Sequence, residues 1–174
     1  PTRIISGMNN TYVLDASRTV YAFKKDVLDG ATWYAPGNSP RWIEERIYDV
    51  CRENETLCET DYSKWDGTVS RWLRNLEMSI INTWLHPEER KHFNDTMAKE
   101  PRCYARIGDF TYEPGDARLS GSPLTTVGNT MLNCFVSYCA YRKVHAGEPS
   151  ANELGIYYGD DGIAAMGAVE LEEV

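Results

Sequence analysis

Two short apolar runs in the stretch "LGIYYGDDGIAAM", residues 154–166, constrain the fold more than any other feature of the chain. Between them, Asp160 and Asp161 stand side by side with a glycine on either side. Apolar runs of this length around glycine and aspartate are typical of two antiparallel strands joined by a tight turn. We therefore predict a β-hairpin here. Because adjacent carboxylates repel each other unless a cation binds, the turn also marks a candidate site.

The rest of the chain alternates between helical and strand-like segments. Apolar residues recur at helical spacing from Val69 to Trp84, and Pro87 is expected to end that run. The other segments, in chain order, are a loop at 29–42, a helix opened by Pro40 and running to 54, a strand at 55–63, strand-like pieces at 99–122, and a long helix at 123–144. This order predicts an α+β domain built around a sheet.

Composition excludes several classes of protein. The 174 residues are enough for one domain with its own core, and 42% apolar against 25% charged residues is ordinary for a globular chain. No apolar run approaches the length of a membrane span. The five cysteines form no CxxC pair, so we expect mainly buried, reduced thiols in an intracellular protein rather than a zinc or disulfide framework.

The net charge of −8 argues against a general nucleic-acid-binding surface. The charges are unevenly distributed, however. Residues 1–25 carry four basic side chains against one acidic side chain, whereas residues 149–174 carry six acidic side chains and no Lys or Arg. If the acids near the end of the chain bind metal ions, the net charge misrepresents the potential that a ligand meets.

A second acidic cluster precedes the hairpin in "TDYSKWDGT", residues 60–68. Asp61 stands where a strand is expected to end. If that strand pairs beside the "IYY" strand, Asp61 meets Asp160 and Asp161 at one edge of the sheet. Three such carboxylates would repel each other strongly without cations, and hard oxygen ligands suit two Mg²⁺ or Mn²⁺ ions. Two ions held close together form the clamp used in nucleotidyl transfer.

Each acidic segment also has an ordinary structural explanation. Taken alone, "GDDG" is more often a solvated turn than a site, because glycine and aspartate favour turns. Asp61 is equally suited to cap the following helix. The segment 61–72 is not a calcium loop, because Trp72 stands where the final glutamate belongs. Only the combination of the two clusters favours a functional site.

The segment "SGSPLTTVGN", residues 120–129, lies between the two acidic clusters. A glycine-containing bend that leads into a helix offers backbone N–H groups and hydroxyls to a phosphate or a ribose. Thr125 and Asn129 lie one helical turn apart and share a face. The alternative is a capped helix with an incidental asparagine, and the isolated segment does not distinguish the two.

Together these segments resemble the RNA-dependent RNA polymerases of positive-strand RNA viruses. "DYSKWD" is similar to motif A of that family, "SGSPLTTVGN" to motif B and "YGDD" to motif C, and the three occur in the family's order. "PTRIISG", residues 1–7, is similar to the end of motif F, a basic segment of the fingers. The similarity is greatest to nodavirus- and tombusvirus-like polymerases.

The resemblance implies catalytic roles for three acids. Asp61 and Asp160 would be the principal ligands of two Mg²⁺ or Mn²⁺ ions, with Asp161 beside them. It further implies a right-hand fold whose palm is an antiparallel sheet backed by helices. Residues 1–54 would then form part of the fingers, and residues 55–174 the core of the palm.

The resemblance also implies a nucleotide site. Asp66 and Asn129 would recognise the ribose 2′-hydroxyl group. The residues that would position or contact the nucleotide and template are Ser120, Gly121, Thr125, Arg3 and Lys64. The implied partners are ribonucleoside triphosphates, an RNA template with its nascent strand, the remaining fingers and thumb, and other replication proteins. The implied location is the host cytoplasm, at membrane-associated replication complexes.

Motifs D and E of the family are not identifiable, so we expect a catalytic-core fragment that is feebly active or inactive alone. Two other functions remain open from the sequence. A reverse transcriptase shares the palm and its aspartates, but Asp66 and Asn129 favour ribonucleotides. A non-catalytic RNA-binding module would use the acids only as turns and caps, but it would normally display exposed aromatic side chains as a motif.

Overall fold

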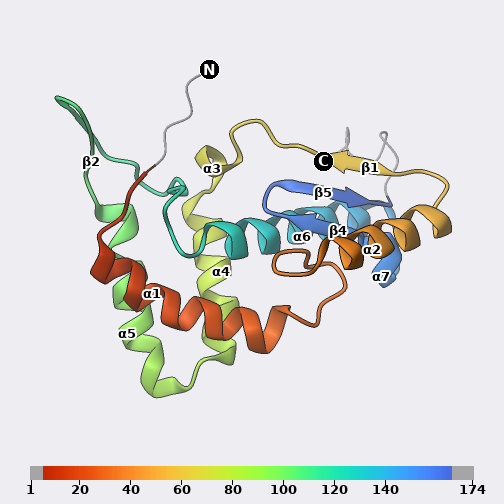
Figure 1. Cartoon of the computed structure of the whole chain (residues 1–174), viewed down its shortest axis with the longest axis horizontal. Helices are drawn as coiled ribbons and strands as arrows, with labels where there is room; N and C mark the ends of the chain where they lie inside the picture. Colours follow the sequence, from red (N-terminus) through yellow and green to blue (C-terminus); the bar gives the residue numbers. More distant parts are fainter. Residues whose placement is uncertain (1–5, 166–174) are drawn as a thin grey trace. The chain divides into compact units, whose positions relative to one another are not determined.

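The computed structural model describes residues 6–165, which form two compact units (Figure 1). The first unit comprises residues 6–25 and 64–125, and the second comprises residues 26–63 and 126–165. Both contain helices and short antiparallel strands, which confirms the predicted mixture of helix and sheet. Among the described helices none is long and apolar enough to span a bilayer.

The first unit is mainly helical. Its elements are α1 (Asn10–Phe23), α3 (Trp65–Thr68), α4 (Arg71–Trp84), α5 (Pro87–Met97), a 3₁₀ turn (Glu100–Arg102), β2 (Ala105–Ile107) and β3 (Phe110–Tyr112). Helices α1 and α5 contact each other (Figure 1). Strands β2 and β3 pair antiparallel as an exposed hairpin, which accounts for the strand-like pieces expected in this part of the sequence.

The two longer helices α1 and α5 were not predicted, nor was the single turn of α3. Helix α1 buries Tyr12, Ala16 and Val20 at intervals of four residues, and the carboxamide of Asn9 caps its first turn. Helix α5 has few apolar residues and follows α4 after a two-residue connection. Pro87 occupies the first position of α5, where the missing N–H group costs nothing, so it begins a helix as well as closing the preceding one.

The second unit is a three-stranded antiparallel sheet packed against helices. Its elements are a short π-helical turn that begins in the first unit (Lys24–Leu28), α2 (Pro40–Glu53), β1 (Cys58–Thr60), α6 (Thr125–Val144), α7 (Ala151–Leu154), β4 (Ile156–Tyr158) and β5 (Asp161–Ala164). The strand order is β1-β5-β4 (Figure 1). A core cluster joins α6 to the sheet through Cys134, Ala140, Tyr141, Tyr157 and Ala164. Burial against α6 therefore fixes which face of the hairpin points inward.

The predicted hairpin is confirmed, but its neighbour is not the expected one. We expected the strand at 55–63 to pair beside the "IYY" strand, which is β4. Instead β1 pairs with β5, with Thr60 opposite Gly162. Tyr157 on β4 forms an isolated parallel bridge with Tyr34, so that edge of the sheet is occupied by a different segment.

Helix α2 begins at Pro40, as predicted. Its cap, the hydroxyl of Ser39, was not predicted. Helix α6 begins at Thr125, two residues later than predicted. The expectation of mainly buried cysteines is wrong, because only Cys134 is buried, whereas Cys51 and Cys139 are exposed. All five are free thiols.

Candidate active site

Strand register brings the two acidic clusters together in the second unit. The pairing of β1 with β5 ends at Thr60 and Gly162. Asp61 directly follows Thr60 and Asp161 directly precedes Gly162, so both lie at this end of the sheet. Tyr158 of β4 pairs with Asp161, so Asp160 lies in the turn at the same end of the sheet. Antiparallel pairing thus places acids far apart in sequence at one end of a single sheet.

Electrostatics agree with this placement. The pKa of Asp161 is raised above its usual value, first by partial burial and then by the negative charges of Asp160, Asp61 and Glu59. A charge acts on a neighbouring carboxyl in this way only when the two groups are close. The acidic end of the sheet is therefore an unfavourable place for further negative charge and a favourable place for a cation.

The carboxylates of Asp61, Asp160 and Asp161 are suitable ligands for a divalent cation, but they are not arranged around one common metal position. Within residues 6–165, no group of three or more His, Cys, Asp or Glu side chains is arranged closely enough to hold a metal ion. Carboxylate oxygens are the ligands that Mg²⁺ and Mn²⁺ prefer. Binding would relieve the repulsion that Asp160 and Asp61 exert on Asp161.

Side chains from α6 hold the backbone of the acidic turn, and sequence reasoning missed them. The Thr130 hydroxyl accepts a hydrogen bond of 2.8 Å from the N–H of Gly159. The Asn133 amide donates to the carbonyl of Asp160 at 2.7 Å and to that of Gly159 at 3.3 Å. Both residues are fully buried polar side chains. A polar pair at i and i+3 within the apolar "NTMLNCF" stretch was the available signal.

Two glycines shape the hairpin itself. Gly159 has a φ of +66°, in the left-handed region that favours glycine. Gly162 lies in β5, where a Cβ atom would lie 2.3 Å from Cδ1 of Tyr157 and 2.8 Å from Oγ1 of Thr60. A side chain at position 162 would therefore force apart the strands that carry Asp61 and Asp161.

The motif B residues belong to a bend and the helix that follows it. Ser120 Oγ accepts a hydrogen bond of 2.8 Å from the N–H of Ser6, and Thr125 Oγ1 donates to the carbonyl of Leu119 at 2.7 Å. A Cβ on Gly121 would lie 2.1 Å from the carbonyl oxygen of Ser6. All these residues are in the first unit, so the bend packs directly against the segment that follows residues 1–5.

The remaining predicted residues fall in different places. Asn129 is on α6 in the second unit and is buried. Asp66 is on α3 in the first unit, where its carbonyl accepts a hydrogen bond of 2.7 Å from the N–H of Arg118. Lys64 immediately precedes α3 in a left-handed conformation, with φ +61°. Arg3 lies outside the described residues.

The alternative role of Asp61 as a helix cap is wrong. The residue at the N-terminal cap of α3 is Lys64, and Ser70 caps α4 through its hydroxyl. Asp61 precedes both and follows β1 directly.

Comparisons with known proteins match nearly the whole chain. A family model of viral RNA-dependent RNA polymerases matches residues 2–173. The RNA-directed RNA polymerase of Striped jack nervous necrosis virus is 39% identical over 165 residues, which cover 92% of this chain and 17% of that protein. Those of Pariacoto virus and Flock house virus are 36% and 35% identical, and each alignment covers 94% of this chain. The chain spans about one sixth of the length of these relatives, 17% in each case.

Proposed function

Since the chain belongs to the viral RNA-dependent RNA polymerase family, we propose that it is a catalytic core that joins ribonucleotides to the 3′ end of an RNA strand, directed by an RNA template. The observation that carries the proposal is the β1–β5 register, which leads Asp61 and Asp161 to the same end of the sheet as Asp160. Separate turns and caps would not require acids from two distant segments to share one strand end.

The proposed mechanism uses these three acids as ligands of two Mg²⁺ or Mn²⁺ ions, with Asp61 and Asp160 as the principal ligands. Bound ions would lower the pKa of the attacking 3′-hydroxyl and stabilise the leaving pyrophosphate. The chain contributes rigid placement of the ligands. Thr130 and Asn133 fix the turn that carries Asp160, and pairing with β5 fixes the strand that leads to Asp61.

Recognition of the nucleotide is assigned to residues around motifs A and B. Asp66 and Asn129 read the ribose 2′-hydroxyl. Ser120, Gly121 and Thr125 position the nucleotide and template, supported by the hydrogen bonds that already fix the bend. Arg3 contacts the triphosphate, and Lys64 adds positive charge nearby.

The proposed context is a longer polymerase. Residues 1–54 contribute to the fingers and residues 55–174 to the core of the palm, with the remaining fingers and thumb supplied by the rest of the protein. The partners are ribonucleoside triphosphates, the RNA template with its nascent strand, and other replication proteins. Replication takes place in the host cytoplasm at membrane-associated complexes, and the isolated 174-residue chain is feebly active or inactive.

The proposal is tested in the full-length polymerase that contains this chain, with an RNA template and each of the four ribonucleotides. Asp61→Asn and Asp160→Asn should reduce incorporation to background while the protein stays folded by circular dichroism. Asp109→Asn is the matched control, because Asp109 is exposed in the β2–β3 turn of the other unit. Wild-type activity in both Asn variants of the site would refute the proposal.

Two further outcomes separate the alternatives. Preferential incorporation of deoxyribonucleotides by the wild-type enzyme would indicate a reverse transcriptase. A non-catalytic binding module would bind RNA without incorporating nucleotides. In that case Mn²⁺ would change the thermal stability of the wild type no more than that of the Asp61 and Asp160 variants. Metal-dependent ribonucleotide incorporation is the expected result.

A further inference from the structure

A buried carboxylate at the centre of the first unit binds three separate parts of the chain. Glu100 is 1% exposed. Its Oε2 accepts hydrogen bonds of 2.7 Å from the hydroxyls of Tyr12 and Ser122, and its Oε1 accepts one of 2.9 Å from Nη2 of Arg74. The three donors come from α1, the motif B bend and α4. One side chain therefore couples the bend to the helical framework.

Residues 116–118, which lead into the bend, are held by side chains of α4. Arg74 donates to the carbonyls of Asp116, at 2.5 Å, and Ala117, at 2.7 Å. The next residue, Arg118, forms a buried ion pair with Glu77 on α4 and donates its N–H to the carbonyl of Asp66. Residues 116–122 are thus held by ionic and polar contacts with Arg74, Glu77 and Glu100.

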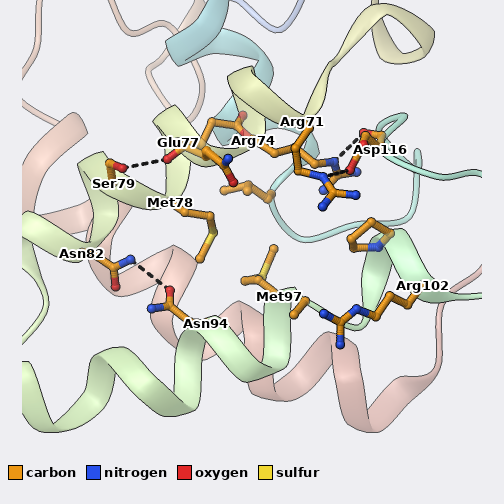
Figure 2. Close-up of a pocket in the computed structure, with 14 residues that line it drawn as sticks. Arg71, Arg74, Glu77, Met78, Ser79, Asn82, Asn94, Met97, Arg102 and Asp116 are labelled. Carbon is orange, nitrogen blue, oxygen red and sulfur yellow. Dashed lines mark hydrogen bonds and ion pairs between the residues drawn. The ribbon is translucent and has the colours of Figure 1, made fainter.

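Arg74 lines a pocket of the first unit but is itself buried. The pocket, of about 390 Å³, lies between α4, α5 and Asp116, and Glu77 lines it too (Figure 2). Arg71 pairs with Asp116 there, with Nε and Oδ1 2.5 Å apart. The hydrogen bonds of Arg74 to Glu100 and to the two carbonyls orient its guanidinium.

We propose that Glu100 is a positioning residue for the incoming nucleotide, because it holds Ser122 and thereby the Ser120–Gly121 bend in place. The proposal rests on the proposed function, in which that bend positions nucleotide and template. Ser120 and Ser122 flank Gly121, so a shift of Ser122 moves the Ser120 hydroxyl with it. Glu100 itself touches neither nucleotide nor metal; it acts through Ser122.

The chemistry requires an ionised carboxylate at position 100. Burial raises the pKa of Glu100, but the charge of Arg74 and the hydrogen bonds from Ser122, Tyr12 and Arg74 outweigh burial and leave the pKa below its usual value. Glu100 therefore remains charged at neutral pH. In Glu100→Gln the charge that pairs with Arg74 is lost, and an NH₂ group that takes the place of Oε2 can no longer accept from the Tyr12 and Ser122 hydroxyls, which would have to turn and accept from it instead.

Three variants of the full-length polymerase separate positioning from general stability. Glu100→Gln removes the charge, and Ser122→Ala removes the link to the bend. Tyr12→Phe is the matched control, because it deletes a hydrogen bond of the same length to the same oxygen but leaves Ser122 bound. We expect the first two to raise the KM for ribonucleotides about tenfold with a smaller change in kcat. Tyr12→Phe should lower the melting temperature without that change in KM.

A second measurement, also on the full-length polymerase, does not depend on activity. Hydrogen exchange should speed up at residues 118–125 in Glu100→Gln and Ser122→Ala, including the N–H of Ser122 that now bonds to the carbonyl of Leu119 at 2.9 Å. Tyr12→Phe should leave exchange at these residues unchanged. Unchanged exchange in both bend variants, or an equal increase in all three, would overturn the positioning role.

The two proposals fail separately. An inactive wild-type enzyme, or wild-type activity in both Asn variants of the site, counts against the polymerase function, and hydrogen exchange then still decides whether Glu100 holds the bend. An active wild type whose Glu100→Gln and Ser122→Ala variants keep the wild-type KM refutes the positioning role alone.

Discussion

The side-chain amide of Asn133 donates a hydrogen bond of 2.7 Å to the backbone carbonyl of Asp160. It thus ties the turn of the β4–β5 hairpin to α6, the helix that packs beneath the sheet. A tight turn with two adjacent like charges is intrinsically unfavourable. Here a partly buried hydrogen bond donated by Asn133 and another accepted by Thr130 hold the backbone of that turn, independently of any cation.

Removing this hydrogen bond should impair catalysis more than folding. Asn133→Leu in the full-length polymerase keeps the side-chain volume but leaves the carbonyls of Gly159 and Asp160 without this donor. A misplacement of about 1 Å at a reacting centre lowers rates about 100-fold, so we expect a loss of about tenfold to 100-fold in incorporation. The Mn²⁺ concentration for half-maximal rate should rise as well.

Asn75→Leu is the control for this change, because Asn75 is exposed on α4. It should leave incorporation within about twofold of wild type. Equal activity in the Asn133→Leu and Asn75→Leu variants would show that the hydrogen bond to Asp160 has no functional role.

A side chain at position 162 should destabilise the sheet. Gly162→Ala places a Cβ 2.3 Å from Cδ1 of Tyr157, and the buried Tyr157 ring has little room to move. Overpacking of this kind costs about 1–3 kcal/mol in the free energy of unfolding. Urea denaturation of the 174-residue chain measures it.

Gly67→Ala provides the comparison, because nothing lies within 4 Å of a Cβ at that position, in α3. Alanine favours helix over glycine by about 1 kcal/mol, so this variant should be equal to wild type or slightly more stable. A Gly162→Ala variant as stable as Gly67→Ala would contradict the close approach of β1, β4 and β5 at this point.

The contribution of Glu100 to stability should depend on pH. Its folded-state pKa is lower than the usual value of 4.5, so its ionisation favours the folded state. This stability is fully present above the unfolded pKa and is lost as pH falls through the folded pKa. At pH 7, Glu100→Gln should lower the free energy of unfolding by about 3 kcal/mol, as expected when one partner of a buried ion pair is removed.

The difference between wild type and Glu100→Gln should shrink steadily below about pH 4.5, which urea denaturation at pH 7, 5, 4 and 3 can follow. A difference that stays constant over this range would mean that the carboxylate charge contributes nothing.

Relief of repulsion should stabilise the metal-free chain. The pKa of Asp161 is raised above its usual 3.8, so ionisation of this group opposes folding. Asp161→Asn should therefore raise the melting temperature at pH 7 by about 1–2 °C, a modest effect because the side chain is exposed. The gain should disappear as pH falls below about 4, where the wild-type carboxyl is protonated.

Asp109→Asn, an exposed acid in the other unit, should give no such increase. Addition of Mn²⁺ should reverse the ranking and make the wild type more stable than Asp161→Asn. A wild type that stays less stable in saturating Mn²⁺ would argue against Asp161 as a ligand.

Local sequence patterns predicted the elements whose formation depends on near neighbours. Glycine and aspartate between apolar runs identified the β4–β5 hairpin, and Pro40 identified the start of α2. Helix α5 was not predicted because its sequence is mostly polar. Its few apolar side chains are stabilised by packing in the fold, where α5 contacts α1. The roles of Thr130 and Asn133 were not predicted because their hydrogen-bond partners are backbone atoms 29 and 27 residues away.

By itself, the sequence determined the family through the order of three short motifs, and it determined which acids belong to the candidate site. Only the tertiary structure decided that β1 pairs with β5 rather than β4, and that Glu100 meets Tyr12, Arg74 and Ser122. The physical reason is that hydrogen-bonded partners of a strand edge or a buried carboxylate are chosen by packing across the fold. These partners cannot be predicted from the local spacing of residues along the chain.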